Sequence, residues 1–297
     1  MNNNSWFKKE MPLQTVIGFG GGATGFGAYS SSSVPPKYVD EVFSTYVYKG
    51  NETSRNITNN INLNKGGLVW VKSRNDTHDH HLADTVRGAN QIMMSNDTDV
   101  DSTLANRITA FNNDGFTLGT AGQVNGTSAY DYSSWTFRKA KGFFDIVSYS
   151  GDGVSGRTIS HGLGCVPGLI IIKSTTNATS WFTYHRSLGA TKYMMLNHDN
   201  TEATQSWFMN DTTPTATEFT LGSSTNVNGS GRDYIAYIFA GGESTAGNAR
   251  SGNFTGSADR LWMDGGTDFQ FGTGDFTIES WVRPSTTSNP DGIYQFS

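Results

Sequence analysis

The chain has one cysteine, Cys165, among its 297 residues, so no disulfide within the chain can stabilise it. Charged residues are scarce, at 16% of the sequence; the net charge is −5, and lysine and arginine form no run. Affinity for a phosphate backbone comes from clustered cations. We therefore expect no nucleic-acid partner.

Long hydrophobic runs are also missing. The longest, such as Leu169-Ile170-Ile171-Ile172, have the length of a strand and fall far short of the ~18 apolar residues that a membrane helix needs. Lys8 and Lys9 lie near the start, but no apolar segment follows them as in a secretory signal. We expect a soluble protein made in a cytoplasm, without membrane insertion.

Glycine and aromatic residues are abundant: there are 35 glycines, and aromatic residues make up 12% of the chain. With so few charges, this composition favours sheets and turns over helices and excludes wholesale disorder. Several short segments alternate as strands do, for example Phe43, Thr45 and Val47 against Ser44 and Tyr46. The sequence therefore predicts an all-β fold.

The sequence repeats itself at long range. Tyr48-Lys49-Gly50 recurs as Tyr149-Ser150-Gly151, and the segment 67–72 recurs as 168–173, both 101 residues later. This period is too long for a solenoid repeat and indicates a duplicated domain.

We place the two copies at residues 38–142 and 143–242, as two tandem homologous β-sandwich domains of jelly-roll-like type. In the later part of each copy, Phe116-Thr117-Leu118-Gly119 recurs as Phe219-Thr220-Leu221-Gly222 at an offset of 103, which indicates a small insertion in the second copy.

Two regions flank the copies. Residues 1–37 are rich in Asn, Gly and Ser and lack enough apolar residues for a core, so we expect an extended arm that orders against another protein. Its candidate anchoring residues are the scattered aromatics Trp6, Phe7, Phe19 and Phe26.

A small polar linker, 243–252, precedes a third pattern at 253–297. The run GTGDFTIESWVRP at 272–284 resembles the opening strands of the concanavalin-A-like, laminin-G-like jelly roll. Because open sheet edges would remain unpaired, this incomplete third jelly roll is expected to continue in the natural protein or to be completed by a partner.

One motif resembles a nucleotide site. Residues 20–25 satisfy G-x-G-x-x-G, but Ser30–Ser33 and Pro35-Pro36 follow where a dinucleotide site needs a helix. We interpret this motif as part of the arm, and we expect no cofactor.

Two clusters are weak metal candidates. His78 and His80 lie in a histidine-rich segment, but neighbouring strand residues point to opposite faces, so a polar loop is the default interpretation. A site shared by several chains around a symmetry axis remains open. Asp97, Asp99 and Asp101 alternate like the start of a calcium loop; the glycine and glutamate of an EF-hand are absent, which leaves a looser calcium site or a solvated turn.

Catalytic patterns are weak. His161 lies four residues before Cys165, a spacing that could suit a nucleophile and its base, but a structural role for the Cys165 thiol is the favoured interpretation. No pair of acidic residues stands out for glycoside hydrolysis. We therefore expect no enzymatic activity. Candidate surface aromatics for stacking on sugars are Trp181, Tyr184, Trp207 and Tyr130, although burial in a core is the favoured interpretation for each of them.

The two copies carry several distinctive stretches. They include GGLVWVKSRND at 66–76, DTVRGA at 84–89, FNNDGFTLG at 111–119, WTFRKAKGFFDIVSYSGDG at 135–153, ISHGLGCVPGLIIIK at 159–173 and YHRSLGATKYMMLN at 184–197. As a set they resemble virion structural proteins of marine tailed phages, particularly those that infect cyanobacteria.

This resemblance implies a tail fibre or appendage located in the virion tail. The arm would attach to other virion proteins, such as a tail adaptor, nozzle or portal-proximal protein. The C-terminal region would bind host surface polysaccharide, and the chain would form a homotrimer. A head fibre or capsid decoration protein is one alternative, and a polysaccharide depolymerase tailspike is another.

Overall fold

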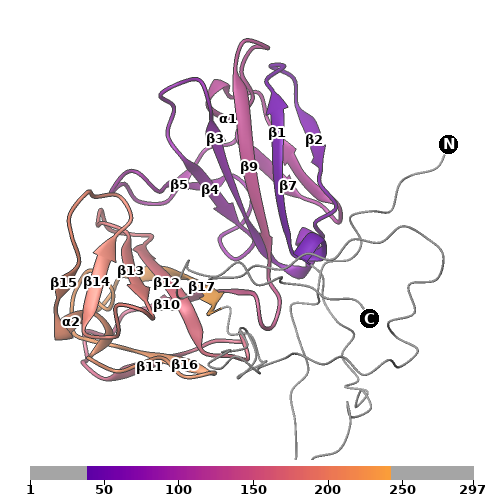
Figure 1. Ribbon diagram of the computed structural model, residues 1–297. Helices are drawn as coiled ribbons and strands as arrows, with labels where there is room; N and C mark the ends of the chain where they lie inside the picture. Colours follow the sequence, from indigo (N-terminus) through magenta and orange to yellow (C-terminus); the bar gives the residue numbers. More distant parts are fainter. Residues whose placement is uncertain (1–38, 242–297) are drawn as a thin grey trace, which may run out of the picture. The chain divides into compact units, whose positions relative to one another are not determined.

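The computed structural model describes residues 39–241, which form antiparallel sheets joined by turns and short helices (Figure 1). The predicted all-β class is therefore confirmed for this part of the chain. Its helices have three or four residues each: η1 (Val39–Glu41), η2 (Leu63–Lys65), α1 (Gly122–Asn125) and α2 (Ser206–Met209). None of them is long and apolar enough to cross a membrane.

The predictions for the arm 1–37, including Trp6, Phe7, Phe19 and Phe26, lie outside the described residues. So do those for the linker 243–252 and for the segment 253–297.

The N-terminal module, as we call residues 39–142, contains a six-stranded and a three-stranded sheet. Its strands are β1 (Phe43–Lys49), β2 (Arg55–Thr58), β3 (Gly67–Ser73), β4 (His81–Asp84), β5 (Gln91–Met94), β6 (Ser102–Thr103), β7 (Ile108–Phe111), β8 (Gly115–Leu118) and β9 (Asp131–Arg138). The larger sheet has the order β1-β9-β3-β4-β5-β6, and the smaller has the order β2-β8-β7.

The C-terminal module, residues 143–241, contains a six-stranded and a two-stranded sheet. Its strands are β10 (Phe144–Ser150), β11 (Arg157–Ser160), β12 (Pro167–Ser174), β13 (Phe182–His185), β14 (Lys192–Met195), β15 (Ala203–Thr204), β16 (Glu218–Leu221) and β17 (Asp233–Ala240). The larger sheet has the order β10-β17-β12-β13-β14-β15, and β11 pairs with β16. In each large sheet the first strand of the module pairs with its last strand, the last pairs with the third, and the fourth, fifth and sixth follow in order. The two large sheets therefore have the same topology.

Alternation along the strands explains how each module forms two layers. In β3, Val69 and Val71 point into a core shared with Ile57 and Phe116 of the smaller sheet, whereas Leu68 belongs to a different cluster on the other face. Side chains two residues apart thus pack together, and each large sheet covers a small one.

A recurring corner stabilises the same place in both modules. The rings of Tyr48 and Tyr132 stack with centroids 5.2 Å apart, and Tyr149 and Tyr234 repeat this distance. The Tyr48 hydroxyl donates to a backbone carbonyl at 2.8 Å, as does the Tyr149 hydroxyl. The repeated Tyr-x-Gly blocks in the sequence therefore encode a buried, hydrogen-bonded turn.

A glycine is required at this corner because the backbones approach closely. A Cβ on Gly50 would lie 2.1 Å from the carbonyl oxygen of Gly126, and one on Gly151 would lie 2.2 Å from that of Gly229. The modules differ in the elements beside their small sheets. In the N-terminal module β7 pairs with β8, whereas in the C-terminal module the short helix α2 packs near β16.

The two large sheets also contact each other. A third apolar cluster combines Leu68, Leu82 and Met93 with Phe144, Ile146 and other residues of the C-terminal module. The central strands β12 and β17 of the large sheet in the C-terminal module are therefore buried on both faces. The inner face of this sheet carries Ile170 and Ile172 against α2 and β16, and its outer face meets the N-terminal module.

Candidate functional site

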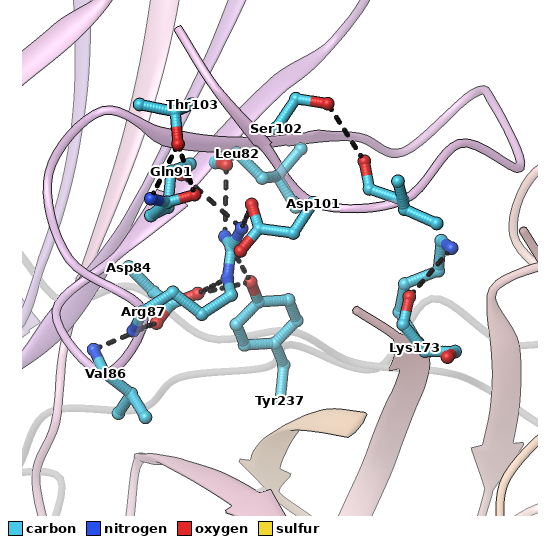
Figure 2. A network of polar contacts seen from close by, with 12 residues as sticks. Leu82, Asp84, Val86, Arg87, Gln91, Asp101, Ser102, Thr103, Lys173 and Tyr237 are labelled. Carbon is cyan, nitrogen blue, oxygen red and sulfur yellow. Dashed lines mark hydrogen bonds and ion pairs between the residues drawn. The ribbon is translucent and has the colours of Figure 1, made fainter. Parts of the chain in front are cut away.

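Arg87 forms the centre of a buried polar network between the modules (Figure 2). Its Nε donates to Asp84 Oδ2 at 2.6 Å, and Nη1 donates to Asp101 Oδ1 at 2.8 Å and to the Gln91 carbonyl at 3.4 Å. Its Nη2 donates to the Leu82 carbonyl and to the Tyr237 hydroxyl, both at 3.2 Å. All five N–H groups of the guanidinium are used.

Asp84 and Tyr237 complete this arginine network, which we define as Asp84, Arg87, Asp101 and Tyr237. The Tyr237 hydroxyl donates to Asp84 Oδ2 at 2.7 Å, and the other carboxylate oxygen accepts the backbone N–H groups of Val86 and Arg87, both at 2.9 Å. The side chain of Asp84 is fully buried and that of Arg87 is 6% exposed. The network therefore holds a satisfied ion pair where an unpaired charge would be very costly.

Burial and the neighbouring charges shift the pKa values of Arg87, Tyr237 and Asp101; burial raises the pKa of Asp101, which Arg87 opposes. Burial lowers the pKa of Arg87, but Tyr237, Asp84 and Asp101 outweigh it and raise the pKa above its ordinary value. Burial also raises the pKa of the Tyr237 hydroxyl well above its ordinary value. At neutral pH the arginine is charged and the tyrosine is a neutral donor.

Residues 94–101 of the N-terminal module form a second part of the junction. The indole N–H of Trp181 is shared between the carbonyls of Met94 and Asp97, both at 3.0 Å, and Lys173 Nζ donates to the Thr98 carbonyl at 3.1 Å. Trp181 and Lys173 are fully buried. Burial lowers the pKa of Lys173 to about 8, while Asp99 and Asp97 oppose the shift.

The three aspartates proposed as a calcium candidate have separate surroundings. Asp97 Oδ1 accepts the N–H of Thr98 at 2.5 Å, Asp99 is exposed, and Asp101 binds Arg87. In residues 39–241 no group of three or more His, Cys, Asp or Glu side chains is arranged to hold a metal ion. The structure therefore places this segment at the junction between the modules.

The histidines are separated as well. The ring of His78 lies 5.8 Å from that of Tyr130, and His80 Nδ1 accepts the indole N–H of Trp70 at 2.9 Å. His81 is fully buried between the Asp79 carbonyl and Arg107, and burial lowers the pKa of His81 to about 4. His81 is thus neutral at pH 7.

The other sequence candidates are mainly structural. His161 accepts the N–H of Leu163 at 3.3 Å within its own loop, and Cys165 packs partly buried against the core of the C-terminal module. Trp181 and Tyr184 are at most 1% exposed, so the favoured interpretation, burial in a core, is confirmed for both and a surface role is excluded. Trp207 and Tyr130 are partly buried against the module cores.

Two clefts lie beside the junction. One, of about 630 Å³, is lined by residues that include Arg87, Asp101, Ser150 and Asp233. The other, of about 360 Å³, we call the tryptophan cleft; it is lined by Trp70, His80, Ser95, Asn96, Leu196, Asn197, His198 and Asp199. Both modules contribute residues to each cleft.

Several residues of the junction and of the tryptophan cleft, Arg87, Tyr237 and Trp70 among them, were not predicted from the sequence. One signal was available: Asp84 and Arg87 break the repeat, since His185 and Leu188 stand 101 residues later. A buried charged pair that one copy has and the other lacks indicates a contact specific to that copy.

Comparisons with known proteins place the chain in a family. Residues 38–268 match the family described as a domain of unknown function, DUF7483. No curated protein and no solved structure matches the chain. The match includes both modules and more than half of the sequence, so the chain belongs to the DUF7483 family.

Proposed function

We propose that this chain is a structural protein of a phage virion, a tail fibre or similar appendage. The two modules are homologous jelly-roll-like copies that form a rigid spacer. The N-terminal arm attaches to other virion proteins, the region beyond residue 250 faces host polysaccharide, and the chain forms a homotrimer. This role is binding and support without enzymatic chemistry or a cofactor.

The observation that carries the proposal is the junction between the large sheets. An apolar cluster and a satisfied ion pair are buried there together, with Tyr237 of one module bonded to Asp84 and Arg87 of the other. Two domains on a flexible tether have no need of such a contact. A spacer that keeps its ends at a fixed separation does need it.

The recurring corner also supports duplication. Asn125 donates to the Gly119 carbonyl at 2.9 Å, and Asn228 repeats this bond to Gly222 at 3.1 Å. Both asparagines are fully buried. The same side chains serve the same turns, as expected of copies that extend a shaft by repetition. The resemblance to phage virion proteins supplies the setting.

Purified virions provide the test. Mass spectrometry of the virions should detect the chain, and immunogold labelling with antibodies to it should mark the tail. Gold on the capsid would instead favour a head fibre or decoration protein, and absence of the chain from purified virions would refute a structural role.

The depolymerase alternative has its own assay. Purified full-length chain incubated with host polysaccharide should release no reducing ends. Release above the level of a heat-inactivated sample would overturn the assignment of a passive role.

A further inference from the structure

We propose that the tryptophan cleft binds an uncharged sugar residue of a glycan. This goes beyond the proposed spacer role, because a spacer need not bind any ligand along its length. The proposal rests on two observations. An aromatic surface is partly exposed in the N-terminal module but buried in the C-terminal module, and the polar atoms around it can form further hydrogen bonds.

The aromatic surface is a row on the outer face of the large sheet. Trp70 is paired across the strands with Trp135, their ring centroids lie 6.1 Å apart, and the His80 ring lies 5.7 Å from Trp70. All three side chains are partly exposed.

The matching row in the C-terminal module shows how this face looks when it is covered. The counterparts of Trp70, Trp135 and His80 are Ile171, Tyr237 and Trp181. Their exposures are 6%, 1% and 0%. The C-terminal module therefore buries this surface. In the N-terminal module the equivalent surface is partly exposed and has larger aromatic groups at its centre.

The Trp70–His80 hydrogen bond fixes which groups remain available. An indole N–H can only donate, so His80 Nδ1 must be the acceptor and the neutral ring carries its proton on Nε2. Burial and then Lys72 lower the pKa of His80, which favours the neutral ring. Nε2–H is left to donate to a ligand.

Asn197 and Asp199 add a donor and an acceptor. The side-chain oxygen of Asn197 accepts the backbone N–H of Trp181 at 3.0 Å, which fixes the orientation of the amide and leaves its N–H₂ group to donate. Asp199 is exposed, and within the described residues its carboxylate has no hydrogen bond or ion pair. Aromatic carbon flanked by donors and an acceptor is what a sugar ring with one apolar face requires.

The charge of the lining selects among sugars. Among the described residues, no lysine or arginine lines the cleft, and Asp199 is the one carboxylate in the lining. A phosphate, sulfate or uronic acid would meet this carboxylate with no cation in that lining to pair with. The volume of about 360 Å³ is near the lower limit for ligand sites and suits a single sugar residue within a chain.

The experiment uses the full-length chain on an array of uncharged and acidic glycans, with titration calorimetry for each hit. We expect binding to uncharged glycans and about tenfold or greater weakening by Trp70→Ala. Asp199→Asn should weaken the same binding several-fold; because this exposed side chain makes no contact that the fold needs, it tests the proposal even if Trp70→Ala unfolds. Tyr46→Ala, which removes an exposed aromatic outside the cleft, is the matched control and should bind as the wild type does.

Three results would overturn the proposal. They are no binding to any uncharged glycan on the array, binding to acidic glycans alone, and binding that Trp70→Ala and Asp199→Asn both leave unchanged in folded protein. If Trp70→Ala instead changes the oligomeric state in light scattering while no glycan binds, the row is a protein contact. None of these results bears on whether the chain is found in virions.

Discussion

Replacing Tyr237 with phenylalanine tests the junction with little change in shape. The ring stays, so no cavity forms, but the hydroxyl that donates to Asp84 at 2.7 Å and accepts from Arg87 at 3.2 Å is lost. One N–H of the guanidinium and one lone pair of the carboxylate are then left unsatisfied. Both partners are almost fully buried: the side chain of Arg87 is 6% exposed and that of Asp84 is not exposed.

The expected cost follows from the charge of the partners. A hydrogen bond to a charged group contributes about 1.5–3 kcal/mol, and a neutral one contributes about 1 kcal/mol. Tyr237→Phe loses two such bonds and should therefore lower the free energy of unfolding by about 3–6 kcal/mol. Tyr149→Phe, which removes a neutral bond of 2.8 Å to the Val227 carbonyl within one module, should cost about 1 kcal/mol.

Urea denaturation of the two variants and the wild type measures this difference. The midpoint for Tyr237→Phe should fall by about 1 M or more, since slopes are about 1–3 kcal/mol/M. Combining Tyr237→Phe with Arg87→Met should cost less than the sum of the two single changes, because the same bonds are counted in both. Equal losses for Tyr237→Phe and Tyr149→Phe, or full additivity with Arg87→Met, would refute the reasoning.

Three further changes probe separate contacts. Lys173 has its pKa lowered to about 8 in the folded chain, against an ordinary 10.5, so the unfolded state binds more protons between these pH values. The free energy of unfolding of the wild type, relative to that of Lys173→Met, should therefore rise by about 2–3 kcal/mol from pH 8 to pH 10.5. If urea titrations give the same difference between the two proteins across that range, the amine is not buried as described. Trp181→Phe removes an N–H shared by two carbonyls and should cost about 2 kcal/mol in thermal unfolding, and a loss below about 0.5 kcal/mol would show that this contact is unimportant. Gly50→Ala forces a Cβ to 2.1 Å from a carbonyl and should cost about 2–3 kcal/mol, whereas Gly122→Ala, with open space around it, should be nearly neutral; similar melting temperatures for the two would be inconsistent with the corner.

Local patterns in the sequence were sufficient to predict some of the strands. The alternation in Phe43–Val47 predicted β1, and the recurrence of segment 67–72 at 168–173 marks β3 and β12, which occupy equivalent positions in their sheets. Both patterns depend on which side of a strand faces a core, and a few neighbouring residues determine this.

The junction could not be predicted in this way because its contacts join residues far apart in the chain. Arg87 and Tyr237 are 150 residues apart, and their meeting depends on how one outer sheet face packs on another. The sequence could not separate a surface position from a core position for Trp181, because aromatic residues occur at both. The burial of Trp181 comes from the N-terminal module, about which the neighbouring sequence carries no information.

The aspartates at 97–101 show the same limit. Their spacing resembles a calcium loop, but the carboxylate of Asp101 binds Arg87 and the loop backbone accepts Lys173 and Trp181. Sequence spacing places side chains relative to their neighbours along the chain. It does not show that Asp101 already pairs with the guanidinium of Arg87, which lies in the turn after β4.

The spacer role and the tryptophan cleft both require that the two modules behave as one body. Hydrogen exchange of the full-length chain in increasing urea, followed by mass spectrometry, tests this directly. Peptides covering Val69 and Val71 in the first core and Ile170 and Ile172 in the second should lose protection at the same urea concentration. Loss of protection in one core while the other stays protected would contradict the account, because the sheets would then be separate domains that only touch.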